Sequence, residues 1–554
     1  MSKFLNFREK LVVFALFFLI IGSLIFWLSS LYIGFTKPIP KSGGEYVEGV
    51  VGQPLYINPL LSQTSEADSD LVQFIYSGLF KYDSKGELKN DLAEGYEVSE
   101  DQKTYTVHLR KNLFWHDGQP LTANDVLFTI SVLQDPAYKS PLRQNWQEVD
   151  VAQVDDYTLD FNIRNPYFGF LSNLTVGILP KHIWGNIAPE KFSLADYNLK
   201  PIGSGPYKFV DFQKSSSGEI LSYNLKAFDK YSEGEAYISR IVFNFYPDED
   251  TMIAAYNKKE IKGMQTIDPE KIDSIKNKKS TKINELFYPR YFSVFFNQSK
   301  SVPLANNNVR KALAQAVNRK EIIDQILKGR GVQIFSPFLE TMDENNSDVD
   351  KREFDLGKAK EILDDAGWKM KDGETVREKN GTKLQFKIYT ADYSALVETA
   401  NILVKQWKEI GVDASVEALS VTDLQQNYIR PREYEALLFG QVTSFDPDLY
   451  SYWHSSQKAD PGLNLGMLDN KDADALLRDI RQELDEEKRA EKYKEFQKIL
   501  SEEVPAVFLY SPYYLYPVSS DVKGIDVKNI NFPYWRFADV NKWYINTSRV
   551  KNNL

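Results

Sequence analysis

Covalent and metal chemistry would need groups of side chains that this sequence does not contain. The four histidines, His108, His116, His182 and His454, include no pair at the spacing of metal ligands. The absence of cysteine excludes disulfides, thiolate metal sites and a cysteine nucleophile. No Gly-x-Ser-x-Gly segment is present to expose a serine nucleophile on a tight turn. We therefore expect a protein that is not an enzyme and that has no metal site and no cofactor.

One glycine-rich segment must be weighed as a phosphate-binding loop. Gly203-Ser204-Gly205-Pro206 comes nearest to that pattern, but Pro206 would break the helix that such a loop opens. We interpret the segment as a rigid turn. Carboxylates are abundant, at 77 Asp and Glu residues, so no catalytic pair stands out among them.

Length and charge narrow the class of protein. A chain of 554 residues is too long for one compact core, which favours two or three domains. Hydrophobic residues at 43% and charged residues at 26% are ordinary for a folded globular protein. The net charge of −10 argues against a nucleic-acid partner, which would require a basic surface.

The N-terminal segment has the composition of a membrane-spanning helix. No charged residue occurs over residues 11–35, and a helix of that length reaches roughly 37 Å, enough to cross a bilayer. A cleaved signal peptide is the alternative, but the apolar run is longer than a signal core and no small-x-small cleavage site follows it. We expect a retained single-pass anchor in the cell membrane.

Basic residues set the expected orientation of this anchor. Lys3, Arg8 and Lys10 lie before the apolar run, and basic flanks tend to remain cytoplasmic. Residues 1–10 are therefore expected inside the cell, with the bulk of the chain on the extracytoplasmic side. Residues 36–44 contain two prolines and a glycine pair and are predicted to be a linker.

Strand and helix patterns alternate along the rest of the chain. Glu45–Val51 predicts a first strand, and polar–apolar alternation predicts another over Gln102–Arg110. Thr122 and Asp125 form a capping box that predicts a helix start. The C-terminal half is predicted to contain a strand at 384–388, a helix at 396–410 ended by Gly411, a charged helical region at 471–503, and strands between 505 and 516. This alternation predicts α/β lobes.

Short motifs are spread over nearly the whole chain after residue 44. Residues 93–130 contain Leu109-Arg110, Trp115-His116-Asp117-Gly118 and Thr122-Ala123-Asn124-Asp125-Val126 in that order. Further motifs are Gly203-Ser204-Gly205-Pro206-Tyr207, Phe296-Asn297, Val309-Arg310-Lys311-Ala312-Leu313, Asn318-Arg319, Ala366-Gly367-Trp368 and Asp446-Pro447-Asp448. Together they resemble the large peptide-class solute-binding proteins, the bacterial extracellular solute-binding family 5.

The resemblance implies a fold and its division into domains. The fold is α/β, a two-lobed clam like that of periplasmic binding proteins, with an extra subdomain and here one preceding transmembrane helix. Lobe I is expected to comprise residues 45–81, 198–285 and 505–554. The inserted subdomain is expected at 82–197 and lobe II at 286–504.

The resemblance also implies where a ligand lies. In peptide binders of the family the ligand lies between the lobes and pairs through its backbone with short strands, as an added strand. The matching substrate-binding residues here are Gln63, Thr64, Ser65 and Glu66 in lobe I and Gln441, Val442, Thr443, Ser444 and Asp446 in lobe II.

One of these positions differs from the family pattern. Peptide binders have an aspartate at the position of Thr443, where it pairs with the free α-amino group of the ligand. A hydroxyl cannot supply that charge-assisted bond, so we expect a ligand that does not need a free amine, such as a blocked or cyclic peptide or a glycan. Asp446 could compensate, although it occupies the turn position.

The implied function is that of the extracytoplasmic substrate-binding component of an ABC importer. Such a protein captures a peptide or peptide-like solute between its lobes and delivers it to membrane permease subunits, here as a monomer. The alternative is a membrane-anchored solute sensor or peptide chaperone of the same fold that takes no part in transport.

Overall fold

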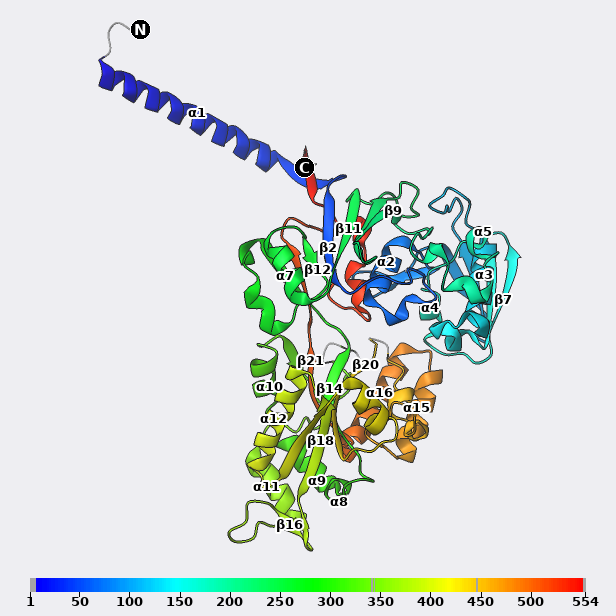
Figure 1. The fold of residues 1–554 in the computed structure, drawn as a ribbon, viewed down its shortest axis with the longest axis vertical. Helices are drawn as coiled ribbons and strands as arrows, with labels where there is room; N and C mark the ends of the chain where they lie inside the picture. Colours follow the sequence, from blue (N-terminus) through cyan, green and yellow to red (C-terminus); the bar gives the residue numbers. More distant parts are fainter. Residues whose placement is uncertain (1–5, 340–341, 343, 445–446, 552–554) are drawn as a thin grey trace.

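The computed structural model describes residues 6–339, 342, 344–444 and 447–551. A long N-terminal helix leads through a two-stranded ribbon into lobe I, and lobe II lies on the far side of lobe I from that helix (Figure 1). The expected two-lobed α/β clam, preceded by one apolar helix, is confirmed.

Helix α1 (Phe7–Phe35) contains the expected anchor and has no buried residue. Its N-terminus is capped reciprocally: Glu9 N donates to Asn6 Oδ1 (3.0 Å) and Asn6 N donates to Glu9 Oε2 (2.8 Å). Among the described residues it is the single helix long and apolar enough to cross a membrane.

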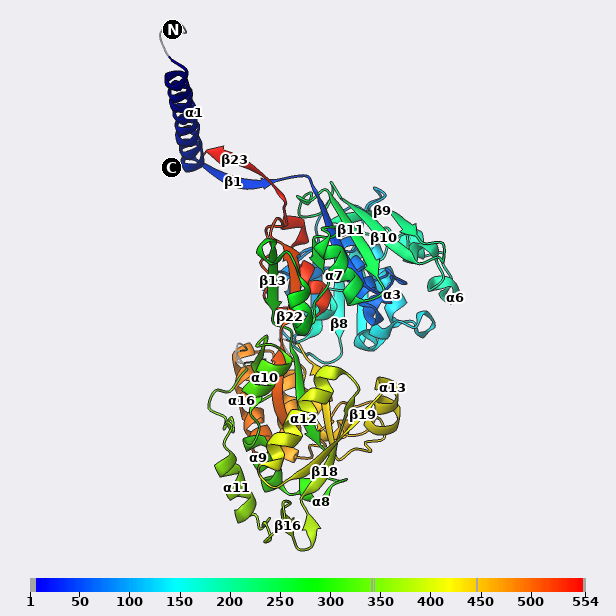
Figure 2. The same cartoon turned by 60° about the vertical axis from the view of Figure 1, so that its left-hand side comes forward.

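The segment after α1 is a strand, so the expected linker at 36–44 is wrong over its first part. β1 (Thr36–Lys41) pairs antiparallel with β23 (Asn546–Lys551), which comes from the other end of the chain (Figure 2). Pro38 and Pro40 are two positions apart, so both nitrogens face the same edge of β1, and an edge strand tolerates proline where that edge is unpaired. The two prolines that predicted a linker are therefore compatible with an edge strand.

Lobe I is built on a seven-stranded sheet. Its order is β13-β22-β12-β2-β11-β10-β9, and the expected first strand, β2 (Glu45–Val51), lies in the centre, parallel to β11. The other strands are β9 (Tyr207–Lys214), β10 (Ile220–Ala227), β11 (Arg240–Tyr246), β12 (Gly263–Met264), β13 (Thr281–Leu286) and β22 (Tyr514–Ser519), and the helices are α2 (Glu66–Ile75) and α7 (Glu249–Asn257).

The inserted region folds around a separate four-stranded antiparallel sheet, β5-β6-β8-β7. β6 (Thr104–Leu109) buries alternate residues as its sequence predicts, and α3 (Ala123–Gln134) starts at the predicted capping box, where Thr122 N donates to Asp125 Oδ2 (3.0 Å). Its other elements are β3 (Phe80–Tyr82), β4 (Leu88–Asn90), β5 (Ala93–Val98), β7 (Val149–Asp155), β8 (Thr158–Ile163), α4 (Phe170–Asn173), α5 (Lys181–Trp184) and α6 (Pro189–Phe192).

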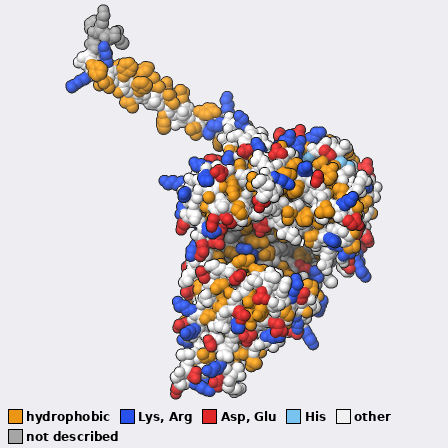
Figure 3. Space-filling model, viewed as in Figure 1, with side chains coloured by type: hydrophobic (Ala, Val, Ile, Leu, Met, Phe, Trp, Pro, Cys, Tyr) orange, Lys and Arg blue, Asp and Glu red, His pale blue; other side chains and the backbone are white. Residues whose placement is uncertain are grey.

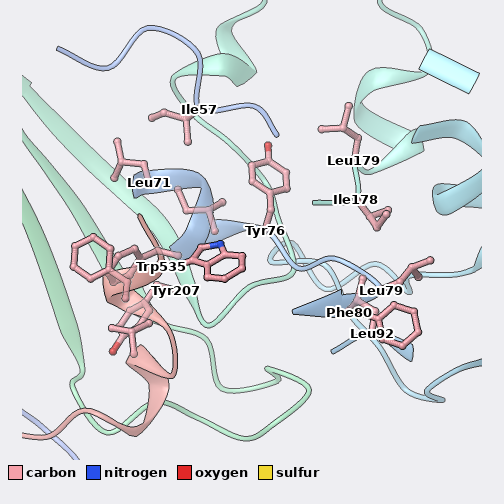
Figure 4. Close-up of a cluster of buried hydrophobic side chains, with 14 of the residues drawn as sticks. Ile57, Leu71, Tyr76, Leu79, Phe80, Leu92, Ile178, Leu179, Tyr207 and Trp535 are labelled. Atoms are coloured by element: carbon pink, nitrogen blue, oxygen red, sulfur yellow. The ribbon is translucent and has the colours of Figure 1, made fainter. Parts of the chain in front are cut away.

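This subdomain and lobe I share one hydrophobic core. Figure 4 shows Leu92, Ile178 and Leu179 of the subdomain in the same cluster as Leu71 and Trp535 of lobe I. The subdomain therefore packs on lobe I as part of one rigid unit, rather than as a separate domain on a tether.

Two of the sequence motifs meet at the junction of lobe I and the subdomain. The His116 imidazole bridges the turn: Gly203 N donates to Nδ1 (3.2 Å), and Nε2 lies 3.0 Å from Gly205 O. A Cβ on Gly203 would lie 1.9 Å from Ile75 O, so this glycine is required by a close approach to the end of α2. The rigid-turn interpretation of 203–206 is confirmed.

Lobe II is built on a six-stranded sheet of order β15-β21-β14-β20-β18-β19. Its strands are β14 (Arg290–Phe296), β15 (Gly331–Gln333), β18 (Gln385–Ala391), β19 (Asp413–Leu419), β20 (Ala436–Val442) and β21 (Ala506–Pro512), with a small hairpin of β16 (Glu378–Lys379) and β17 (Thr382–Lys383). Its helices are α8 (Val302–Ala305), α9 (Asn307–Gln315), α10 (Arg319–Ile326), α11 (Leu356–Asp365), α12 (Ser394–Lys408), α13 (Val421–Asp423), α14 (Tyr450–Trp453), α15 (Lys471–Gln482) and α16 (Glu486–Glu503).

The predicted charged helical region at 471–503 is confirmed and consists of two helices, because Asp485 caps a new helix by accepting from Lys488 N (3.1 Å). The expected start of the last lobe I segment needs correction. Lobe I does not resume at residue 505: β21 pairs with β14 inside the lobe II sheet, and the return to lobe I comes at Tyr513. The apolar run from 505 to 516 therefore belongs to two sheets.

A fully buried charge cluster joins the C-terminal segment to lobe I. Arg536 Nη1 donates to Asp70 Oδ1 (2.8 Å), and Arg536 Nη2 lies 3.3 Å from Glu48 Oε1. Burial raises the pKa of Glu48 to about 7 and that of Asp70 to about 6, and the guanidinium opposes both shifts.

Candidate binding site in the cleft

A cleft separates the two lobes. Figure 3 shows the surface hollowed between them, with hydrophobic side chains along the hollow. The chain passes from lobe I to lobe II between β13 and β14, through 287–289, and returns between β21 and β22 at Tyr513. These two short crossings form the hinge about which the lobes would close.

The predicted lobe I residues lie at the start of α2, and they do not form a strand. Ser62–Thr64 is a 3₁₀ turn, and Ser65 caps α2 by accepting from Asp68 N (3.2 Å). Gln63 Nε2 donates to Pro59 O (2.6 Å), and Thr64 is exposed. Glu66 accepts a hydrogen bond from Gln265 Nε2. The expectation that a ligand pairs with a short strand at 62–66 is wrong, because that backbone is already turned into helix.

The predicted lobe II residues lie at the end of β20, next to the hinge. Thr443 N and Oγ1 both donate to Pro289 O (2.8 and 3.2 Å), so its hydroxyl is directed at the crossing strand. Gln441 is buried between Tyr291 Oη (2.6 Å) and Leu463 O (2.9 Å) and supports the strand from behind. Val442 is 37% exposed and Ser444 is half-buried, whereas Asp446 lies outside the described residues.

β20 has one free edge over its second half. β14 pairs with β20 along its whole length, but β18 pairs only with Ala436 and Leu437. Thr443 N donates to Pro289 O, so Thr443 directs its backbone groups toward the β14 side. Successive residues of a strand direct these groups to opposite edges, so the amide and carbonyl groups of Gly440 and Val442 face away from β14. Among the described residues no strand covers that edge. The Val442 carbonyl accepts from Tyr452 Oη (2.6 Å), which leaves the groups of Gly440 and the Val442 amide directed outward.

A cavity of about 370 Å³ lies against this free edge. Its walls come from four parts of lobe II: strand β20, the turn that follows α13, helix α14, and the loop that follows α14. They combine apolar side chains with two arginines. The lining residues are Gln425, Ile429, Arg430, Arg432, Phe439, Gly440, Gln441, Val442, Tyr452, Asp460, Pro461, Gly462, Leu463 and Leu465. An open strand edge beside an apolar cavity is the arrangement that binds an extended peptide through its backbone and one side chain.

Charged side chains of both lobes influence Tyr288 at the hinge. Burial raises the pKa of Tyr288; the Arg290 guanidinium opposes this shift and Glu66, from lobe I, reinforces it. Arg290 Cζ lies 5.5 Å from the ring centres of both Tyr288 and Phe292. Its Nε is buried with no hydrogen-bond partner among the described residues. An anionic side chain of lobe I and a cationic side chain of lobe II thus act in opposite directions on the Tyr288 hydroxyl.

A second contact between the lobes lies on the subdomain side of the cleft. Arg489 Cζ of α16 lies 4.4 Å from the ring centre of Phe168, which precedes α4. Burial raises the pKa of the neighbouring Tyr167 to about 12, with smaller effects from Arg481 and Asp448 of lobe II. In this structure the lobes therefore touch across the cleft as well as at the hinge.

Of the cavity walls, sequence reasoning named only Gln441 and Val442, and it did not identify Tyr288, Arg290 or Phe168. These residues are far apart in the chain and carry no motif. One signal was available: Pro289 interrupts an aromatic strand pattern over 286–296, and a proline inside a strand marks a break in it. Among the described residues no group of three or more His, Cys, Asp or Glu is arranged to hold a metal ion.

Residues 87–462 match the middle region of the bacterial extracellular solute-binding proteins, family 5. This chain therefore belongs to that family. It is 29% identical over 516 residues to the oligopeptide-binding protein AppA of Bacillus subtilis, covering 91% of this chain and 92% of that protein. It is 30% identical over 505 residues to the dipeptide-binding protein of Escherichia coli, covering 85% and 90%.

Solved structures agree with the fold. The structure of Bacillus subtilis AppA in complex with a nonapeptide superposes with a TM-score of 0.70 at 28% identity, covering 92% of this chain and all of that one. CtaP, an ABC transporter substrate-binding protein of Listeria monocytogenes, superposes with a TM-score of 0.78 at 27% identity, covering 91% and 99%.

Proposed function

We propose that this chain is the extracytoplasmic substrate-binding component of an ABC importer and that it binds a peptide or peptide-like solute as a strand added to β20. The free edge of β20 beside the cavity carries this proposal. The Gly440 carbonyl would accept a ligand N–H, and the Gly440 and Val442 amides would donate to ligand carbonyls. Relatives named for oligopeptide and dipeptide binding support a ligand of this class.

Capture requires closure and no covalent step. A ligand on β20 that also reaches Glu66 contacts both lobes, so it stabilises the closed state more than the open one. The closed protein would then dock on permease subunits and release the ligand to them. Scattering, or a pair of fluorophores on the two lobes, should show compaction on ligand addition. Release of a cleaved product would contradict a binding protein without turnover.

Peptides that are N-methylated at single positions test the strand-addition mode. In an added strand only alternate amides bond to β20, so methylating one of two adjacent nitrogens should weaken binding several-fold, about 1 kcal/mol, and methylating its neighbour should not. Titration calorimetry with the peptide that co-purifies with the protein, identified by mass spectrometry, gives the measurement. Equal tolerance at every position would show that the ligand does not bind as a strand.

We also propose that α1 is retained as a single-pass anchor with its N-terminus inside the cell. The contacts of β23 support this: Arg549 donates to Ile33 O (3.0 Å), Thr36 O (2.6 Å) and Thr36 Oγ1 (2.8 Å), and so caps the C-terminal end of α1 with a positive charge. Cleavage before β1 would leave Arg549 without the Ile33 carbonyl. N-terminal sequencing of protein extracted from membranes tests the anchor, and a mature start near residue 37 would refute it.

A further inference from the structure

The ribbon formed by β1 and β23 carries only positive charge. Lys37 and Lys41 lie on β1, Arg549 and Lys551 lie on β23, and neither strand contains Asp or Glu. Figure 3 shows Lys and Arg side chains gathered where the helix meets lobe I. The rest of the protein has a net negative charge, so this cationic ribbon is a local feature and does not reflect the overall composition.

Three of the four cations have no side-chain partner among the described residues. Arg549 is held by the end of α1, as described above. Lys37, Lys41 and Lys551 are exposed, and among the described residues none forms a hydrogen bond or an ion pair through its side chain. Their backbone is fixed by the pairing of β1 with β23, so the three charges stay together on one ribbon.

The ribbon also has a defined distance from the apolar helix. β1 begins at Thr36, directly after Phe35, and six residues of strand extend roughly 20 Å. Arg549 bonds to Ile33, so β23 reaches back to the last turn of α1. If α1 spans a bilayer, Lys37, Lys551 and Arg549 lie at the depth of the lipid phosphates, within about one Debye length (~8 Å) of them.

We infer that the ribbon binds anionic phospholipid headgroups of the outer leaflet and thereby holds lobe I close to the membrane. Unpaired cations at headgroup depth attract a negatively charged bilayer surface. The pairing of β1 with β23 transmits this attachment to the body of lobe I, because the strand that follows β1 in the chain, β2, is central in the lobe I sheet. This inference rests on the membrane anchor proposed above.

A single-cysteine label tests the inference, and the absence of native cysteine makes the label specific. Ser548→Cys, half-buried on β23, would carry a spin label in full-length protein reconstituted into nanodiscs. The discs would contain either phosphatidylcholine alone or equal parts of phosphatidylcholine and phosphatidylglycerol. We expect the label to become several-fold less accessible to a water-soluble relaxation agent in the anionic discs, and high salt should reverse the change.

Charge variants decide whether the ribbon lysines are responsible. Lys37→Gln, Lys41→Gln and Lys551→Gln together should abolish the response to phosphatidylglycerol, and the same three positions changed to Arg should retain it, which separates charge from folding. The control, Lys358→Gln, Lys360→Gln and Lys383→Gln, removes the same charge from the far end of lobe II, near α11 and β16 (Figure 1), and should respond like the unmodified protein.

The failure of each proposal has a separate signature. Protein that does not co-elute with discs of either composition refutes the anchor. Protein that co-elutes but shows the same label accessibility in both discs refutes the lipid contact and leaves the anchor standing. If inorganic phosphate added to phosphatidylcholine discs reproduces the effect, the ribbon binds a free anion and the lipid assignment is wrong.

Discussion

Phe168→Ala should shift the ligand-free protein toward its open form. Phe168 of the subdomain and Arg489 of α16 make a direct contact across the cleft, with 4.4 Å between Arg489 Cζ and the ring centre. Arg489 is only 5% exposed, so the interaction is worth about 1–2 kcal/mol, the upper part of the range for cation–π pairs. Because about 1.4 kcal/mol changes an equilibrium constant tenfold, we expect the closed-to-open ratio to fall roughly tenfold.

The same change should weaken ligand binding by a related factor. A ligand that binds only the closed form must supply the closure energy that the contact no longer provides, so the apparent Kd should rise by up to about tenfold. Fluorophores on single cysteines in each lobe would report the open fraction, and calorimetry would report Kd. Phe168→Leu keeps an apolar contact without the aromatic ring and should give an intermediate result. Phe354→Ala, at another partly exposed phenylalanine, is the matched control. An unchanged open fraction in Phe168→Ala would refute this reasoning.

Three further changes test the site and its support. Thr443→Asp should create a preference for free-amine over N-acetylated peptides worth about 1.5–3 kcal/mol, measured by calorimetry; loss of binding to the unmodified protein on acetylation would contradict our interpretation of Thr443. Arg536→Gln leaves two buried carboxylates without their cation and should lower the free energy of unfolding by about 3–5 kcal/mol in urea titrations, and a loss below about 1 kcal/mol would show that the cluster is not an ion pair in solution. Burial lowers the pKa of His116 from 6.5 to about 4, so the folded state favours the neutral ring; its stabilisation should be complete above pH 6.5 and should decrease by roughly 3 kcal/mol as pH falls to 4, and His116→Gln should flatten this part of the stability profile.

The sequence predicted correctly those strands and helix starts that depend only on neighbouring residues. β2, β6 and the start of α3 follow from alternation and a capping box, which need only neighbouring residues. Helix α12 ends at Lys408, and Gly411, in the left-handed region at φ +82°, turns the chain away soon after it, as predicted. The family resemblance then supplied the arrangement of lobes that no local pattern contains.

Pairing between distant segments was the part that the sequence could not determine. The strand pattern over 505–516 is correct, but nothing in it shows that β21 pairs with β14 in one lobe and β22 with β13 and β12 in the other. The prolines of β1 suggest a linker until β23 is present to pair with it. In the site, the binding role of Thr443 stays a prediction, and the structure adds that its hydroxyl bonds to Pro289 at the hinge, whereas Arg290 and Phe168 act through contacts made only in three dimensions.

The late position of β21, β22 and β23 in the chain has a consequence for export. These three strands follow one another over Ala506–Lys551, and they complete lobe II, lobe I and the ribbon respectively. As the part of the chain after α1 crosses the membrane, β1, β13 and β14 are exposed long before their partners β23, β22 and β21 arrive. The subdomain sheet can form early, but neither the lobe I sheet, the lobe II sheet nor the ribbon is complete until the final segment has crossed, so a product truncated before Ala506 would leave all three open to proteases at the cell surface.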